Sequence, residues 1–166
     1  MIGTTLAGAT IATAILFLSM RKWWTGGRQL KDLIPTVQGL LTGAMSTVCV
    51  GGLAGWLSGC TRQAVNFGGG TAVSGTTGTD SSGPIATGTM GALSEEGGVV
   101  VFLLFVATIA AYKAFNKEEK GRLTGAMVAG SILCATAGVA GALDSLPGIA
   151  NGLGAAGVSL FEGKSL

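Results

Sequence analysis

The sequence predicts an all-α protein of four apolar, transmembrane-type helices, arranged as two tandem helical hairpins with an irregular Gly/Ser/Thr-rich connection. Three observations lead to this fold class. Only 11% of the residues are charged, against about 25% in an ordinary soluble domain. Four long segments carry no charge at all. Eight of the ten Lys and Arg residues lie in two short clusters, each between two of these apolar segments.

The first hairpin is expected over residues 1–61. Its first 20 residues are uncharged, and a helix of that length spans about 30 Å, the thickness of a bilayer core. A basic loop over residues 21–32 follows, with Trp23 and Trp24 as expected anchors at the membrane interface. Because the basic residues follow the apolar run, we expect this run to be retained and not removed as a leader. Residues 33–61 form the second apolar segment.

The rest of the chain repeats this order after a polar connection. Residues 62–96 show no helical period, and we expect an irregular or extended linker there. The second hairpin is expected over residues 97–147, with its basic loop at 113–122. Residues 148–166 form an apolar, glycine-rich tail, in which we expect a short interfacial helix.

Small residues recur every fourth position along the second and fourth apolar segments. Such a stripe lets another helix backbone approach closely, as in membrane helix pairs. The partner helix lies either within the chain or in a neighbouring copy, and we expect extensive self-assembly. The predicted helix-packing and assembly residues are Gly39, Gly43, Gly51, Gly55, Gly59, Ala126, Gly130 and Gly138.

Two short motifs indicate an internal repeat. Ala9–Ala12 recurs 98 residues later as Ala107–Ala110, and Leu41–Met45 recurs 82 residues later as Leu123–Met127. Both motifs keep their order around a basic loop, so we interpret the halves as a parallel duplication. Because Lys and Arg favour the cytoplasmic side of a membrane, both basic loops are expected there, with the termini and the linker outside.

The residue content argues against an enzyme. The chain has no His, the commonest general base and metal ligand. Its three cysteines form no CxxC pair, and no phosphate-loop motif, nucleophile with a base or suitable carboxylate pair is present. We therefore expect no metal site, no small-molecule substrate and no cofactor other than bound phospholipid.

The basic loops are the main candidate sites, with two interpretations. In one, the cations set the topology and meet lipid headgroups; in the other, they form a cationic ring that holds anionic lipid or passes DNA. The residues concerned are Arg21, Lys22, Arg28, Lys31, Lys113, Lys117, Lys120 and Arg122.

Each half, an apolar helix, a basic loop and a small-residue helix, resembles a conjugative (type IV secretion) pilin. That resemblance implies a membrane hairpin that is extracted into a helical tube, with the basic loop facing the lumen and acidic phospholipid between subunits. It makes the eight cations lumenal, and Val37–Gly59 and Leu123–Ala142 the packing helices. The chain differs from these pilins in its second hairpin and its long linker.

The expected function is a structural subunit of a membrane-derived filament of the conjugative pilus kind, or of a transfer apparatus. Its expected partners are copies of itself and membrane lipids, with DNA passing through a lumen. Its expected location is the cell membrane, and an extracellular filament after assembly. The alternative is a phage holin or another small pore-forming or accessory membrane protein.

Overall fold

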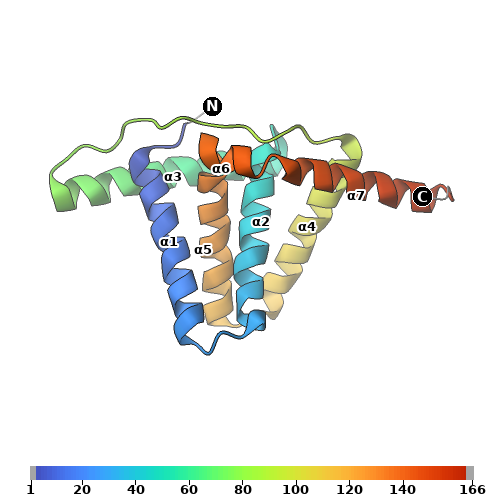
Figure 1. The fold of residues 1–166 in the computed structure, drawn as a ribbon, viewed down its shortest axis with the longest axis horizontal. Helices are drawn as coiled ribbons and strands as arrows, with labels where there is room; N and C mark the ends of the chain where they lie inside the picture. The colour runs from blue at the N-terminus through green and yellow to red at the C-terminus, as the bar shows by residue number, and fades with distance from the viewer. Residues whose placement is uncertain (1–2, 164–166) are drawn as a thin grey trace.

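The structure, a computed structural model that describes residues 3–163, has a helical stem that widens toward a flat top (Figure 1). The stem contains α1 (Leu6–Thr25), α5 (Lys117–Leu133), α2 (Ile34–Val48) and α4 (Glu95–Ala114). A short 3-10 turn, η1 (Leu30–Leu33), leads into α2. Across the wide end lie α3 (Gly52–Thr77), α6 (Ala137–Ala142) and α7 (Ser145–Phe161). Both basic loops lie at the narrow end.

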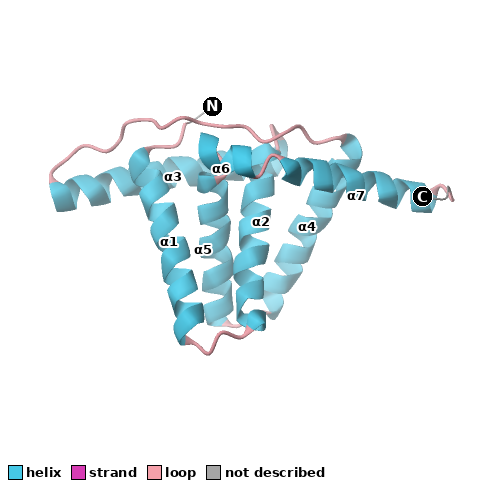
Figure 2. Cartoon of the chain, viewed as in Figure 1, coloured by secondary structure: helices cyan, strands magenta, loops and turns pink. Residues whose placement is uncertain are grey.

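The predicted all-α class is confirmed, because helices and loops account for the described chain apart from two isolated β-bridges (Figure 2). The prediction of four transmembrane-type helices is not. Among the described helices, α4 alone is long and apolar enough for a membrane span by itself. The 15-residue α2 and the 17-residue α5 are short, and α1 includes Arg21 and Lys22 before it ends. The segment from η1 through α2 is long and apolar enough for a span only when it is combined with α3, and the two parts are bent by 104° relative to each other.

The second apolar segment is two helices and not one. Helix α2 ends at Val48, and α3 begins at Gly52, whose φ of 71° lies in the left-handed region that glycine adopts without strain. Helix α3 then continues to Thr77 and ends at Gly78. The prediction of an irregular linker over residues 62–96 is therefore wrong for residues 62–77. The extended connection is confined to residues 78–94.

The two predicted hairpins are interleaved. Helix α1 packs mainly against α5 and α3, whereas α4 packs mainly against α7 and α2. Ala12 of α1 contributes to one core cluster with Ala129 and Ile132 of α5. The longest interface joins α2 and α5 at the centre of the stem. The two helices that flank each basic loop thus do not pack along one another, which corrects the tandem arrangement.

A pseudo-two-fold axis relates the halves, and Gly43 and Gly130 show it directly. A Cβ on Gly43 would strike the carbonyl oxygen of Met127, and one on Gly130 would strike that of Leu40. Gly43 and Leu40 are each 87 residues before Gly130 and Met127. The contact is therefore reciprocal, which is the property of an interface with two-fold symmetry.

The same relation holds where the arms α3 and α7 join the stem. Asn66 of α3 donates to the Gly3 carbonyl (2.8 Å) and accepts from the Thr5 backbone N–H (3.1 Å). Asn151 of α7 donates to the Ala92 carbonyl (3.1 Å) and accepts from the Ser94 backbone N–H (2.9 Å). Thr5 and Ser94 are the N-cap residues of α1 and α4. Each arm therefore holds the first stem helix of its own half through one asparagine.

The duplication has a different register from the one that the short motifs indicate. Structurally equivalent positions are 89 residues apart at the caps Thr5 and Ser94. In α2 and α5 they are 87 residues apart. Ala9 lies in the first turn of α1 at the wide end, whereas Ala107 lies in the second half of α4. The motif matches at 98 and 82 residues therefore do not pair equivalent positions.

The extended connection ties the halves together across the wide end. Ile85 donates its backbone N–H to the Thr4 carbonyl at 2.9 Å, beside the start of α1. Further on, Gly88 donates to the Ala135 carbonyl at 3.1 Å, and Ala137 donates to the Ala86 carbonyl at 3.0 Å. The tail is also more ordered than expected, since the 17-residue α7 occupies most of it.

Candidate functional site

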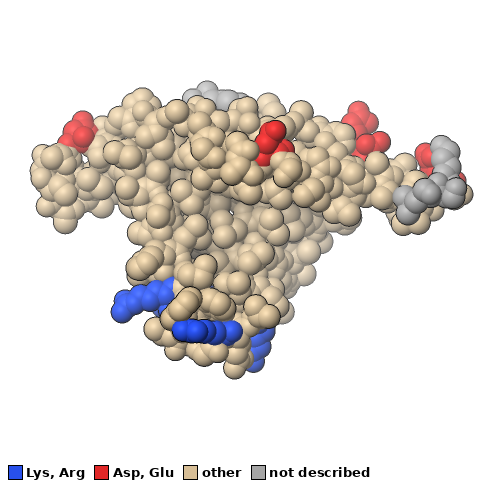
Figure 3. All heavy atoms as spheres, in the orientation of Figure 1, with Lys and Arg blue, Asp and Glu red and all other residues tan. Residues whose placement is uncertain are grey.

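The eight predicted cations all lie at the narrow end of the stem, on or beside the two basic loops (Figure 3). Three carboxylates, Asp32, Glu118 and Glu119, share this end and leave it with five net positive charges. At the wide end Arg62 is the only described cation, against five carboxylates, so that end carries four net negative charges. The five are Asp80, Glu95, Glu96, Asp144 and Glu162.

Each basic loop has a cation–π contact of its own, and one hydrogen bond joins the two loops. The guanidinium of Arg28 lies 4.1 Å from the Trp24 ring centre, and the Lys120 ammonium lies 5.4 Å from that of Tyr112. Nη1 of Arg122 donates to the Asp32 carbonyl at 3.1 Å, which joins the second loop to the first.

A groove of about 780 Å³ runs between α1 and α5 at this end. Arg21 and Lys22 line it from α1, and Lys117 and Arg122 line it from α5. Its upper part is apolar, with Ile15 and Leu18. The groove thus combines four cations from both halves and one carboxylate, Glu118, with an apolar upper part, and this net positive charge suits an anionic lipid headgroup and the start of its acyl chain.

The outer surface of the stem is apolar, although its helices are short. Large hydrophobic side chains that are more than a third exposed lie on α1, α2 and α4, whereas α5 supplies none. They are Leu6, Phe17, Leu18, Met20, Trp24, Ile34, Val37, Leu41, Val99, Phe102, Leu103, Val106, Ile109 and Tyr112. The arms expose others, among them Trp56 on α3 and Leu153 on α7. An apolar surface of this extent is rare on a monomer that lives in water.

The predicted packing residues separate into two groups. Gly39, Gly43, Ala126 and Gly130 are buried between α2 and α5, so their partner helix lies within the chain. The other four have different positions. Gly51 lies in the elbow before α3, Gly138 lies in α6 with open space beside it, and Gly55 and Gly59 line a pocket. The stripe buried between α2 and α5 therefore has no free face for a neighbouring copy.

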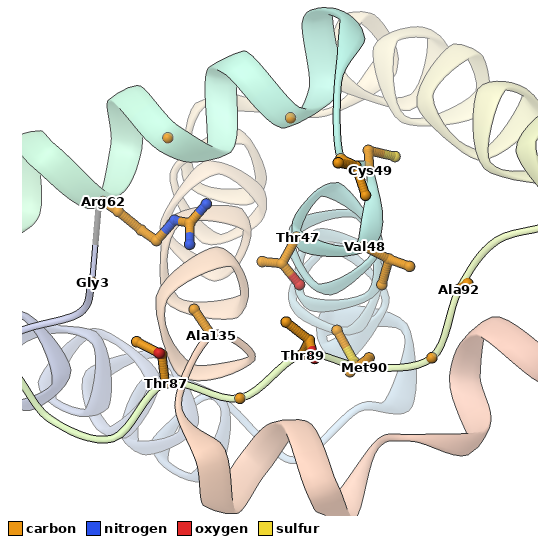
Figure 4. Close-up of a pocket in the computed structure, with 15 residues that line it drawn as sticks. Gly3, Thr47, Val48, Cys49, Arg62, Thr87, Thr89, Met90, Ala92 and Ala135 are labelled. Carbon is orange, nitrogen blue, oxygen red and sulfur yellow. The ribbon is translucent and has the colours of Figure 1, made fainter. Parts of the chain in front are cut away.

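That pocket, with a volume of about 500 Å³, is the site that the sequence analysis missed. It lies at the wide end, beneath α3 and above the ends of α2 and α5 (Figure 4). Gly55, Gly59 and Arg62 line it from one face of α3, and residues 87–92 of the extended connection line it opposite. The glycines leave room for it, because they present no side chain to the space.

Arg62 projects its guanidinium into this pocket (Figure 4). Its Nε donates to the Ser58 carbonyl at 3.4 Å, and within the described residues it forms no ion pair. Burial in the pocket wall lowers the pKa of Arg62, although a guanidinium stays protonated at any physiological pH. A cation without a carboxylate partner is thus retained at the acidic end of the molecule.

Comparison with known proteins adds no relative. No protein-family model, no curated protein sequence and no solved structure matches the chain significantly. The arguments on function therefore depend on the geometry, the charges and the surface of this chain.

Proposed function

We propose that the chain is a structural membrane subunit, of a filament of the conjugative pilus kind or of a transfer apparatus. One observation carries this proposal: among the described residues, an apolar-surfaced stem separates five net positive charges at one end from four net negative charges at the other. In water that surface would drive aggregation, whereas in a bilayer it is solvated by hydrocarbon.

The charges give an orientation. Lys and Arg favour the cytoplasmic side of a membrane, so the narrow end faces the cytoplasm. The 20-residue α4 reaches about 30 Å, which matches the hydrocarbon core. Trp23 and Trp24 then lie at the inner interface, and Trp56 on α3 at the outer one, as in an aromatic belt. The arms α3 and α7 lie along the outer interface.

Self-assembly uses other surfaces than the small-residue stripe of α2 and α5, which is occupied within the chain. The outer flanks of α1 and α4 are apolar and lie on opposite sides of the stem, so copies meet side by side. Such packing gathers the basic ends on one side of the assembly, and anionic lipid in the groove between α1 and α5 offsets their repulsion.

Topology is tested by labelling single cysteines on intact cells. The three native cysteines are replaced (Cys49→Ala, Cys60→Ser and Cys134→Ala), and one cysteine is introduced at the wide end (Ser82→Cys) or at the narrow end (Glu118→Cys). A membrane-impermeant maleimide should label the Ser82→Cys variant on intact cells and the Glu118→Cys variant only after lysis. The reverse pattern would contradict the orientation, and recovery of the chain in the soluble fraction would contradict the membrane assignment.

Assembly is tested on purified material by negative-stain microscopy combined with lipid mass spectrometry. Filaments or rings that retain phospholipid are expected. Detergent-bound monomers without lipid would end the assembly part of the proposal. Expression that makes cells leak small ions without forming an ordered polymer would favour the pore-forming alternative instead.

A further inference from the structure

We propose that the pocket under α3 is an oxyanion-binding site, which takes a phosphate group carried on a small or lipid-borne molecule through Arg62, Thr87 and Thr89. This site lies at the opposite end of the stem from the basic loops. It is independent of the proposed assembly, because all its walls belong to one chain.

The positive charge is the first argument. Arg62 is the only described cation at the wide end, and it is partly buried in a pocket without a carboxylate partner. Holding a guanidinium in a desolvated position without an anion costs free energy. An incoming phosphate removes that cost and accepts two parallel N–H bonds from the planar fork.

The opposite wall supplies further donors. Thr87 and Thr89 line the pocket from the extended connection, where both residues are exposed, so their hydroxyls, which bond to no other described residue, are accessible to a ligand. Figure 4 shows both residues across the pocket from Arg62. A phosphate has enough acceptor oxygens for two walls at once, which favours it over a group with one acceptor.

The size of the pocket indicates what carries the phosphate. A volume of about 500 Å³ exceeds that of a bare phosphate ion and falls within the range of small-ligand sites. The remaining lining is largely apolar, with Val48, Met90 and Ala92 among its residues. The ligand is therefore a phosphate ester with a glycerol-sized or longer remainder, which is either a soluble ester or the headgroup of a lipid.

Binding is measured on purified protein in an uncharged maltoside detergent. The two probes are sn-glycerol 3-phosphate in solution and phosphatidylglycerol in mixed micelles. Isothermal titration gives the affinity, and hydrogen exchange of residues 87–92 reports occupancy of this pocket separately from the basic end. One equivalent of sn-glycerol 3-phosphate should bind, and either probe should slow exchange in residues 87–92, whereas phosphatidylglycerol bound in the groove between α1 and α5 should leave that exchange unchanged. If both probes saturate the pocket, the site accepts the phosphate group on a soluble ester as well as on a lipid. If phosphatidylglycerol alone saturates it, the ligand is a lipid headgroup.

Three variants test the assignment. Arg62→Met should weaken binding at least tenfold and abolish the exchange protection, whereas Lys31→Met, which removes an exposed cation outside both the pocket and the groove, should leave the protection of residues 87–92 unchanged. Gly59→Leu fills the pocket but keeps Arg62, and open space around Gly59 lets the fold accept it. This variant should also abolish protection. The proposal is overturned if neither probe protects residues 87–92 in the wild type, or if the Arg62→Met and Gly59→Leu variants bind as the wild type does.

Discussion

The hydroxyl groups of Thr42 and Thr108 lie 2.9 Å apart at a buried contact between α2 and α4. Gln38 adds a longer bond to the same Thr108 hydroxyl, at 3.4 Å. These side-chain hydrogen bonds join α4, the first helix of the second half, to α2 of the first half. Both threonines are buried in the stem, with Thr42 0% and Thr108 4% exposed.

Replacing Thr108 by Val removes the polar link while it keeps the shape of the side chain. We expect a loss of about 0.6 kcal/mol, and at most about 1.7 kcal/mol, which is the range measured for hydrogen bonds between membrane helices. Unfolding in mixed micelles by a denaturing detergent measures this loss. Thr13→Val serves as the matched control, because the Thr13 hydroxyl bonds only to the Ala9 carbonyl of its own helix. Equal losses in the two variants would mean that the contact between Thr42 and Thr108 adds nothing.

The reciprocal pair Gly43 and Gly130 gives a second prediction. An alanine at either position would press its Cβ onto a backbone carbonyl of the facing helix, which cannot rotate away. Each variant should lose about 1–3 kcal/mol, the usual cost of overpacking. Because both substitutions push the same two helices apart, the double variant should lose less than the sum of the two.

The control for this pair is Gly121, which lies on α5, the helix of Gly130. Gly121 has open space where a Cβ would be, so Gly121→Ala should stabilise α5 by up to about 1 kcal/mol through helix propensity alone. Urea or detergent titration followed by circular dichroism compares the variants. If Gly43→Ala and Gly130→Ala behaved like Gly121→Ala, the close approach of α2 and α5 would be wrong.

Much of the stem was predictable because charge and hydropathy act locally. The clusters around Arg21 and Lys117 mark the ends of helices, and the apolar runs between them form the stem. The pairing of the helices was not predictable, because a stripe of small residues does not say which helix it meets. Gly43 packs on α5, which is not the next helix in the chain. Only the reciprocal contacts distinguish an interleaved duplication from tandem hairpins.

The helical part of α3 beyond residue 61 was not predicted, because tertiary contacts stabilise a helix that its composition does not favour. Residues 62–77 contain several glycines, which weaken an isolated helix. Gly69, however, lies against the backbone of Ala7, as Gly154 of α7 lies against that of Glu96. The pattern Asn-x-x-Gly recurs at Asn66 and Asn151 and would have indicated both arms. The pocket was missed with the arm, since the predicted apolar segment ended at residue 61, before Arg62, and the sequence did not predict that residues 87–92 lie opposite it.

The two asparagines give a third prediction, on local stability. Asn66→Ala should release the backbone N–H of Thr5, and Asn151→Ala that of Ser94, because each loses the amide group that bridges its arm to the stem. Loss of such partly buried hydrogen bonds costs about 0.5–1.5 kcal/mol each. Hydrogen exchange should rise at the start of α1 in the first variant and at the start of α4 in the second.

The control for the asparagines is a cap at the other end of the molecule. Asn116 forms the capping box of α5 with Glu119, and Asn116→Ala should raise exchange only at the narrow end. Exchange that rose at both arms in every variant would indicate global unfolding and would contradict independent arm anchors.

The groove between α1 and α5 gives the last prediction. It gathers Lys22 and Lys117 from the two basic loops, so the double variant Lys22→Gln with Lys117→Gln should weaken binding of anionic lipid. Each basic residue near a membrane surface contributes about 1 kcal/mol, which corresponds to roughly fivefold in affinity per lysine. Lys31→Gln with Lys113→Gln makes the same charge change outside the groove and should weaken binding less. Native mass spectrometry with phosphatidylglycerol and phosphatidylcholine measures the preference, which should fall as salt rises because exposed charges are screened. If both double variants lost binding equally, the narrow end would act through its total charge, and the groove would not be a specific lipid site.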